Sequence, residues 1–396
     1  MPLAVYLLGA AIFAQGTSEL MLTGLLPDIA AEFRISVPVA ALQISAFAFG
    51  MIVGAPLLTI VTLRWSRRNT MIGLLLVFIA GHVAGALATG PELLMATRVL
   101  TAFVYAGFWA VSGATAIALA GPGRSGRAMS VVTGGLTVAM VAGLPLGTLL
   151  GQHLGWRGAF WAVAVASAVA LAGVWWAVPA DRPATAALPD PRRELRAVAD
   201  GRLWLSLTLT ASFTAALLAL FAFLSPMLTE VYGLAPGWVP AVLALYGAAT
   251  VLGIWLGGRL ADTRPYPVLF VSVGGVIAVG LLLPWTTGLA LPGIALIVLF
   301  GGFGFLANPV LSARVVAIAP EAPVMSLALN TSAFNVGITV GPWIGGLVIS
   351  GGFGYPALAW AVVGLGALSL AALCAARLAG IGGRDRTAQP APVPVA

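Results

Sequence analysis

Charged side chains are scarce in this chain. Only 8% of its 396 residues are Asp, Glu, Lys or Arg, whereas a soluble domain carries roughly 25%. Lysine is absent, so all 19 basic residues are arginine, and the formal net charge is +7. The scarcity excludes an ordinary soluble protein. A basic balance can indicate a nucleic-acid partner, but these arginines fall in short loops between apolar segments, which is typical of membrane proteins.

Cysteine and histidine are nearly absent as well. The single cysteine, Cys374, excludes an internal disulfide, and His82 and His153 are too isolated to predict a metal site. No Walker A sequence is present, so we do not expect ATP to be the energy source. No nucleophile and base can be paired either. We therefore expect neither an enzyme nor a protein with a bound cofactor.

Long apolar runs dominate what is present. Apolar residues make up 60% of the chain, and the mean hydropathy is +1.05. A helix that spans a bilayer needs about 20 such residues. Twelve segments qualify: 3–26, 39–62, 70–89, 92–119, 128–150, 158–178, 203–226, 239–258, 267–287, 291–317, 324–349 and 354–378. The first runs into a polar loop without a cleavage pattern, so we expect a retained helix. The sequence predicts an all-α integral membrane protein.

Arginine distribution predicts the orientation of these helices. The loops on one side contain only Arg34 and Arg157. The alternate loops and the C-terminal end contain Arg64, Arg67, Arg68, Arg124, Arg127, Arg182, Arg192, Arg193, Arg196, Arg202, Arg259, Arg264, Arg314, Arg377, Arg384 and Arg386. Because arginine-rich loops stay in the cytoplasm, we expect both termini to be cytoplasmic. We expect the protein itself to lie in the plasma membrane.

The chain divides into two similar halves. GAPLLTIVTLRWSRR begins at Gly54 and GIWLGGRLADTRP at Gly253, an offset of 199, and the same offset relates GWRGAFW at Gly155 to GYPALAW at Gly354. A polar Pro- and Ala-containing stretch lies between the halves. We predict six-helix bundles over 1–178 and 203–379, a cytoplasmic linker over 179–202 and a disordered cytoplasmic tail over 380–396. In such repeats the substrate site lies between the halves near the midplane.

Two six-helix halves joined by a polar loop resemble the major facilitator superfamily. In that family the loop after the second helix reads approximately G-x-L-x-D-R-x-G-R-R, and TIVTLRWSRR matches it at Arg64, Arg67 and Arg68, with Leu63 in place of the acid. The second copy, GGRLADTRP, keeps Gly258, Arg259 and Asp262. The resemblance implies a gating role for these residues, and for Gly143, Pro145 and Gly147 of GLPLG, which are similar to the family's antiporter motif. Plain helix packing is the alternative for that motif.

Other stretches resemble a narrower group. GTSELMLTGLLPDIA, ATRVLTAFVYAGFWAV and GWRGAFWAV are similar to the twelve-helix drug:proton antiporters, and most similar to bacterial chloramphenicol efflux proteins. Sugar and arabinose exporters contain many of the same sequence stretches. The resemblance implies export driven by the proton gradient, and family members usually work as monomers.

Glu19 is a carboxylate inside the first apolar segment. A charge in hydrocarbon costs a few kcal/mol and marks a functional site with a partner nearby. At 1.5 Å per residue, Glu19 lies about 12 Å below the outer end at Pro27, and Arg98 lies about 10 Å below Pro91. We predict a Glu19–Arg98 ion pair. Burial favours a neutral carboxyl and a nearby arginine favours its charged form, so Glu19 is expected to exchange protons. A purely structural ion pair is the alternative.

Other polar and aromatic residues are candidates for substrate binding. Gln15 and Thr23 lie one turn from Glu19 on the same face. The full set is Gln15, Thr23, Tyr105, Trp109, Ser112, Phe213, Phe221, Tyr246, Asn308, Asn330 and Asn335. Core packing is the alternative for the aromatics, and interhelical hydrogen bonding is the alternative for the amides. His82 is expected to be a satisfied packing residue.

These observations predict a proton-coupled exporter of a small, neutral, amphipathic drug, with chloramphenicol as the first candidate. Its partners would be the substrate, protons and membrane lipid, without nucleic acid. A sugar or metabolite exporter is an alternative that would need a more polar lining. A non-transporting sensor or scaffold is a further alternative, and it would not need Glu19 in a cavity between the halves.

Overall fold

The structure, a computed structural model, describes residues 1–62, 65–121, 125–179, 200–261, 263–319 and 323–381. Within these ranges every regular element is a helix, which confirms the all-α prediction. The first half contains α1 (Leu3–Leu20), α2 (Leu22–Phe33), α3 (Val37–Thr62), α4 (Arg67–Ala86), α5 (Pro91–Ala120), α6 (Ser125–Val138), the π-helix η1 (Ala139–Gly143) and α7 (Leu144–Ala177).

The second half has the same character. It contains α9 (Gly201–Phe221), α10 (Leu224–Glu230), α11 (Val239–Leu260), α12 (Pro265–Leu282), α13 (Ala290–Leu306), α14 (Asn308–Ile318), α15 (Pro323–Val348) and α16 (Leu358–Leu378). Short helical turns connect them: η2 (Pro236–Trp238), η3 (Leu283–Thr286), η4 (Ile349–Phe353) and η5 (Tyr355–Ala357).

Eleven helical segments of the described chain are long and apolar enough to cross a membrane. One of them, Arg127–Ala177, has 51 residues, far more than one crossing needs. It is interrupted at Gly155, whose φ of 73° and ψ of 162° lie outside the helical region. The chain turns there, so this segment provides two crossings. The structure therefore agrees with twelve membrane helices.

The two halves repeat each other in their packing. A Cβ on Gly54 of α3 would lie 2.4 Å from the Phe103 carbonyl oxygen of α5, and a Cβ on Gly253 of α11 would lie 2.3 Å from that of Gly302 in α13. Both pairs are related by the offset of 199. Gly155 and Gly354, at the same offset, both have φ 73°. The same close approach and the same turn thus recur, as two copies of one six-helix unit require.

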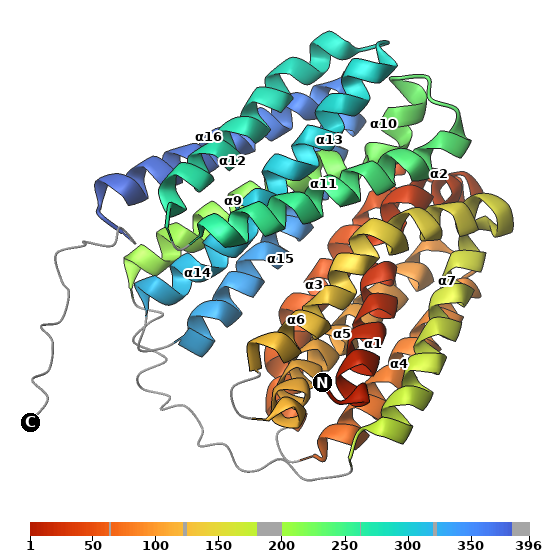
Figure 1. Cartoon of the computed structure of the whole chain (residues 1–396). Coiled ribbons are helices and arrows are strands. Elements are labelled where there is room, and N and C mark those ends of the chain that lie inside the picture. Colours follow the sequence, from red (N-terminus) through yellow and green to blue (C-terminus); the bar gives the residue numbers. More distant parts are fainter. Residues whose placement is uncertain (63–64, 122–124, 180–199, 262, 320–322, 382–396) are drawn as a thin grey trace, which may run out of the picture.

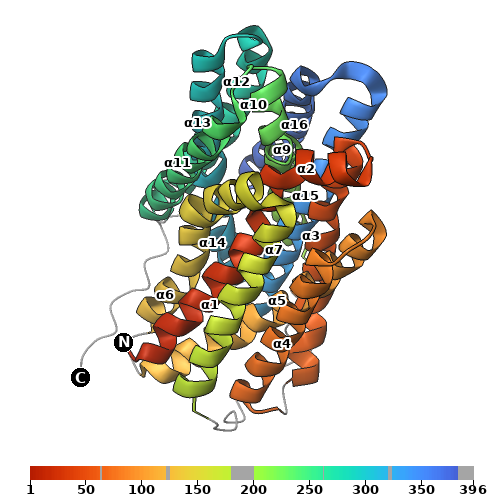
Figure 2. The same ribbon diagram turned by 90° about the vertical axis from the view of Figure 1, so that its right-hand side faces the viewer.

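The halves contact each other through four sets of helices. The elements α2 and α10, α3 and α15, and α11 with α7 and η1 are neighbours. Gln152 Nε2 donates to the Pro236 carbonyl oxygen at 2.6 Å, and Ser45 Oγ donates to that of Thr339 at 2.8 Å. Figures 1 and 2 show the bundles meeting where α2 lies beside α10, and Figure 1 shows them diverging toward the two termini.

Two of the predicted segments differ from the helices in the structure. The first was expected to end near residue 26, but α2 continues to Phe33 with Pro27 inside it, after a tight turn at Met21 where Gly24 N bonds Met21 O at 3.0 Å. The predicted segment 291–317 is two helices, because Pro309 restricts the backbone before it and α13 ends at Leu306. Proline lacks the N–H that would continue the hydrogen-bond ladder.

Candidate functional site

Arg98 lies in a buried hydrogen-bonded chain that joins three helices. Arg98 Nη1 of α5 donates to Ser18 Oγ of α1 at 2.8 Å, and Ser18 Oγ lies 2.6 Å from His82 Nε2 of α4. His82 Nδ1 lies 2.9 Å from the Phe78 carbonyl oxygen. This oxygen can only accept, so Nδ1 carries the proton and Nε2 accepts from Ser18. All three side chains are at most 1% exposed.

Close packing of α4 against α5 makes this chain possible. A Cβ on Gly81 would lie 2.5 Å from Thr101 Cγ2, and one on Gly85 would lie 3.1 Å from Thr97 Oγ1, both on α5. The His82 ring lies 4.2 Å from the Phe78 ring, centre to centre, with the two planes tilted by 36°. Gly81 and Gly85, on either side of His82, thus allow the close helix packing in which the imidazole reaches Ser18.

The predicted ion pair is not formed in this structure. Glu19 follows Ser18 in the chain and is within electrostatic range of Arg98, yet the one ion pair among the described residues joins Arg157 to Glu32. The guanidinium is instead bonded to Ser18 and lies 4.1 Å from the centre of the Phe47 ring. The prediction of a direct contact is therefore wrong here, because the neighbouring serine and the ring of α3 hold the guanidinium.

Glu19 is partly exposed. Tyr6 and Ala10 of α1 are exposed, and Phe13 and Thr17 on the same face are partly buried and line a pocket with η1 and α7. At about 100° per residue, Glu19 lies on the opposite side of the helix, in line with the buried Gln15. The carboxyl group therefore lies on the side of α1 that carries the buried Gln15.

Of the predicted substrate residues of the first half, Gln15 lies one turn from Glu19 and Tyr105 is within electrostatic range of it, whereas Trp109 and Ser112 lie further along α5. Gln15 is 1% exposed, and neither its Oε1 nor its Nε2 has a hydrogen-bond partner among the described residues. The Tyr105 ring is buried between Phe47 and Trp109, at 6.1 and 6.2 Å. Thr23 is buried, and so is Ser112, which donates to the Trp109 carbonyl oxygen at 3.0 Å. The unsatisfied amide of Gln15 is the group here that most needs a ligand.

The second half supplies an aromatic pair. The Phe221 and Tyr246 rings stack at 5.3 Å with an interplanar angle of 29°. Tyr246 is buried, and its hydroxyl has no hydrogen-bond partner among the described residues. Phe213 is buried in the core, with 1% exposure.

The three asparagines differ in how their amides are used. Asn330 Oδ1 accepts from Thr210 at 2.9 Å and its Nδ2 donates to Ser312 at 3.4 Å, which favours interhelical bonding for this residue. Asn335 Nδ2 donates to the Thr331 carbonyl oxygen, while its Oδ1 lacks a partner in the described chain. Asn308 is partly exposed at the start of α14.

The predicted gating residues occupy three places. Arg64 and Asp262 lie outside the described residues. Arg67 begins α4, and Arg68 donates to the Trp175 carbonyl oxygen at the end of α7. Arg259 lies 3.8 Å from the centre of the Trp255 ring.

The predicted glycines divide into tight and open positions. A Cβ on Gly143 would lie 2.2 Å from Thr17 Oγ1, and one on Gly147 would lie 2.5 Å from Met21 Cβ. Pro145 follows η1, whose extra residue per turn bends the helix there. A Cβ on Gly258 would meet open space. On α11, the glycines that lie close to the backbone of α13 are Gly253 and Gly257.

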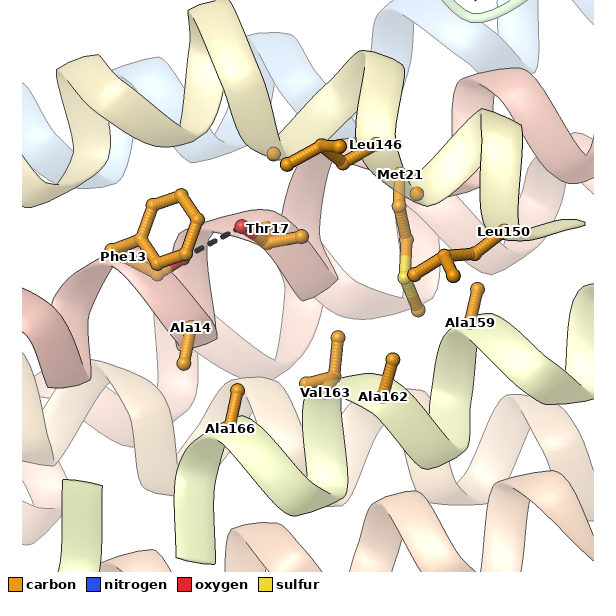
Figure 3. A pocket seen from close by; sticks show the side chains of 12 residues that line it. Phe13, Ala14, Thr17, Met21, Leu146, Leu150, Ala159, Ala162, Val163 and Ala166 are labelled. Atoms are coloured by element: carbon orange, nitrogen blue, oxygen red, sulfur yellow. Dashed lines mark hydrogen bonds between the residues drawn. The ribbon is translucent and has the colours of Figure 1, made fainter. Parts of the chain in front are cut away.

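A pocket lies on the other face of α1 (Figure 3). Phe13, Thr17 and Met21 line it from α1 and the turn after it, Leu146 and Leu150 from the start of α7, and Val163 from beyond the Gly155 turn. The Thr17 hydroxyl is bonded to the Phe13 carbonyl oxygen at 2.8 Å. None of the predicted substrate residues lines this pocket. Its apolar lining offers nothing to a proton or to a polar ligand.

Ser18, His82 and Phe47 are the site residues that sequence reasoning missed. In the sequence, Ser18 could have been noticed because it precedes a carboxylate inside a membrane helix. His82 could have been noticed because it is a titratable residue inside an apolar helix. Both ring nitrogens of His82 have hydrogen-bond partners, as expected, but one partner, Ser18, belongs to the site. Among the described residues, no three His, Cys, Asp or Glu side chains gather as a metal site.

Comparisons with known proteins agree with this architecture. A family model described as Major Facilitator Superfamily matches residues 8–326. A chloramphenicol resistance protein of Streptomyces lividans is 44% identical over 349 residues, which cover 87% of this chain and 88% of that protein. Inner membrane transport protein YdhP of Escherichia coli K12 is 33% identical over 378 residues, which cover 93% of this chain and 94% of that protein.

A solved structure is also similar. It is a bacterial homologue of the human lysosomal transporter Spinster in an inward-facing and unoccupied conformation. The TM-score is 0.69 with 18% identity, and the match covers 95% of this chain and 94% of that one. At this identity the likeness concerns the fold alone. The family match spans most of the chain, and two relatives above 30% identity span nearly all of it. The chain is therefore a multi-pass membrane transporter rather than an enzyme, and it belongs to the major facilitator superfamily.

Proposed function

We propose that this chain is a proton-coupled exporter of a small amphipathic drug, with chloramphenicol as the first candidate. It would work in the plasma membrane by alternating access, exchanging drug for protons. The observation that carries the proposal is Glu19, a partly exposed carboxyl group within a membrane helix, on the face of α1 that carries the buried Gln15.

The surroundings of Glu19 suit proton exchange. Desolvation within the helix bundle favours the neutral acid, and Arg98 lies within electrostatic range, which favours the carboxylate. The two influences oppose each other, so a modest change in the surroundings can transfer a proton. Protonation from the outside would release the drug, and arrival of a drug from the cytoplasm would release the proton.

The arrangement of the halves supports alternating access. They meet at the end that contains Gln152 and Pro236, which the arginine distribution predicts to be the outer end, and diverge at the opposite end. We assign this conformation to the inward-open state, with both termini in the cytoplasm. A monomer suffices, because both halves of the site come from one chain.

Aromatic residues support a drug as the cargo. Trp109 in one half is partly exposed and offers a ring surface for a neutral aromatic molecule, with Tyr105 buried behind it and the stacked Phe221 and Tyr246 buried in the other half. The similarity to a chloramphenicol resistance protein points the same way.

A hydroxylated sugar or metabolite is the second candidate. The unpaired amide of Gln15 and the unpaired Oδ1 of Asn335 favour it, since a hydroxyl-rich cargo would satisfy them. Chloramphenicol also carries hydroxyl and amide groups, so these residues are compatible with either cargo.

Drug susceptibility of an efflux-deficient bacterial host tests the proposal. We expect wild type to confer chloramphenicol resistance and Glu19→Gln to lose it, because glutamine cannot exchange a proton. Glu32→Gln is the matched control: this carboxylate is paired with Arg157 at the predicted outer end, away from Glu19, and its loss is expected to leave resistance intact.

Membrane expression of each variant is measured by immunoblot. Resistance that persists in a well-expressed Glu19→Gln variant would contradict proton coupling at this residue. An expressed wild type that gives no resistance to chloramphenicol or related drugs would shift the cargo to a sugar or metabolite.

A further inference from the structure

The hydrogen-bonded chain of Arg98, Ser18 and His82 leaves most of the guanidinium unused. Arg98 Nη1 donates to Ser18, while Nε and Nη2 have no partner among the described residues. A buried arginine normally uses its planar fork on a carboxylate. Here the carboxylate of Glu19 is near, yet one serine hydroxyl and the Phe47 ring hold the guanidinium instead.

His82 determines what the serine can do. Because its Nδ1–H is bonded to the Phe78 carbonyl, Nε2 is an acceptor and takes the Ser18 proton. Ser18 Oγ then presents its lone pairs to Arg98. Without the imidazole, the hydroxyl would have no acceptor in this position and would be free to turn away from the guanidinium.

We propose that Ser18 and His82 are positioning residues for the Glu19–Arg98 pair. Their hydrogen-bonded chain holds the guanidinium off the carboxylate and thereby sets the acidity at which the transporter accepts its proton. The inference rests on the proposed proton-coupled function of Glu19. It assigns to Ser18 and to helix α4 a part in coupling that neither the sequence nor the comparisons assign.

Few charged groups compete for Glu19. Arg98 and Tyr105 of α5 are within electrostatic range, and His82 of α4 acts through Ser18. The helix α3 contains no titratable residue, and neither does η1.

The other neighbours of α1 carry their titratable groups at a distance. Arg127 lies at the beginning of α6, and His153 and Arg157 lie near the middle of α7, at the predicted outer end. Asp28 and Glu32 belong to the outer part of α2. A change in the position of Arg98 is therefore the largest electrostatic change that a neutral substitution at Ser18 can cause.

The experiment measures uptake of radiolabelled chloramphenicol into inside-out membrane vesicles that contain the full chain, over a series of luminal pH values. In Ser18→Ala the guanidinium is free to contact Glu19, which stabilises the carboxylate. We expect the half-maximal pH to move to the acid side by about one unit or more. His82→Phe keeps the ring beside Phe78 but removes the acceptor, so a shift in the same direction is expected.

Two further variants separate positioning from packing. His82→Gln places an acceptor where Nε2 lies, so its profile is expected to return toward wild type. Thr17→Val is the matched control, because this hydroxyl is next to Ser18 in sequence but is bonded to the Phe13 carbonyl on the other face. We expect no shift for Thr17→Val.

The outcomes distinguish this inference from the proposed function. If Ser18→Ala and His82→Phe transport with the wild-type profile, the positioning role is wrong while Glu19 can still couple protons. If both variants are inserted normally but inactive at every pH, the chain serves folding or binding, and the inference is overturned. If Glu19→Gln still takes up drug in response to a pH gradient, the proposed function itself fails.

Discussion

At the residue scale, the site contains polar groups that the fold leaves without partners. Gln15, Tyr246 and Asn335 each carry at least one buried polar atom with no hydrogen bond in the described chain. Such groups cost free energy in the empty site. In a transporter, a hydrated cavity or a cargo can supply the missing bonds. Asn330 and Ser112 differ, since their bonds are made within the protein, and for them a structural role is favoured.

Tyr246→Phe tests whether an unpaired hydroxyl serves the cargo. Removal of a hydroxyl that bonds nothing is expected to leave the unfolding temperature unchanged or slightly raised. The stacked ring against Phe221 is kept. If the hydroxyl contacts drug, KM for chloramphenicol uptake is expected to rise several-fold with the maximal rate little changed.

Tyr232→Phe is the matched control for this prediction. Tyr232 lies between two candidate membrane spans, and its hydroxyl is hydrogen-bonded to Thr286 Oγ1, at the end of a third span, at 3.1 Å. Its removal is expected to lower stability by about 0.5–1.5 kcal/mol without changing KM. Thermal unfolding in detergent and uptake kinetics measure the two effects. An unchanged KM in Tyr246→Phe would remove this hydroxyl from the substrate site.

At the element scale, glycines determine how closely the helices pack. Thr17 and Met21 on one side of α1 touch Gly143 and Gly147, and Ser18 on the other side bonds His82 and Arg98. The segment that carries Glu19 is thus held from both sides. Membrane helices gain little from burial of apolar side chains against each other, so close backbone contact of this kind is a main source of their association.

Two glycines five residues apart on α11, Gly253 and Gly258, offer a test of this packing. A Cβ on Gly253 would lie 2.3 Å from the Gly302 carbonyl oxygen, which is backbone and cannot move aside, whereas one on Gly258 would meet open space. Gly253→Ala is expected to destabilise the protein by about 1–3 kcal/mol. Gly258→Ala is expected to stabilise it by about 0.5–1 kcal/mol, because alanine favours the helix.

Thermal unfolding of the two variants under identical conditions compares them. Equal effects of the two substitutions would contradict the repeated packing that relates Gly253 to Gly54. The comparison also bears on the gate, because Gly258 belongs to the motif and its neighbour Gly257 makes the close contact with α13 and α14.

At the scale of the whole molecule, the halves contact each other at one end and separate at the other. Pro38 of α3 lies against Gly346 of α15, and a Cβ on Gly346 would lie 3.4 Å from Pro38 Cβ. Alternating access requires this end to open in the other state. A bond across it would hold the molecule in the conformation described.

A Pro38→Cys, Gly346→Cys pair tests this requirement in a Cys374→Ser background. The Cβ separation is close to the range of about 3.5–4.5 Å seen in disulfides. Oxidation is expected to link the halves and abolish drug uptake, and reduction is expected to restore it. The two single variants are the controls. The chain is cleaved by a protease at a site introduced between residues 180 and 199, and the gel mobility of the product shows whether the two halves are still linked. Uptake that continues in the linked protein would contradict alternating access through this end.

Much of the fold followed from composition and periodicity. The apolar lengths predicted twelve crossings, and the repeated GWRGAFW and GYPALAW stretches predicted two equivalent halves. The turns at Gly155 and Gly354 bear this out, because both glycines adopt the same positive φ. Helix ends were harder to predict. Pro27 lies inside α2, and the segment around Pro309 is broken, since neighbouring helices decide whether a proline bends or ends a membrane helix.

The sequence alone determined that the chain spans a membrane, that it repeats, and that Glu19 and Arg98 lie at similar depth, because each depends on local hydrophobicity and on the rise of a helix. Only the tertiary structure decided which atoms meet. Ser18 rather than Glu19 bonds Arg98, and His82 joins them from a third helix. Spacing along one helix predicts depth and face, but the partner of a buried guanidinium depends on how three helices pack, and close contacts at glycines such as Gly81 and Gly85 settle that packing.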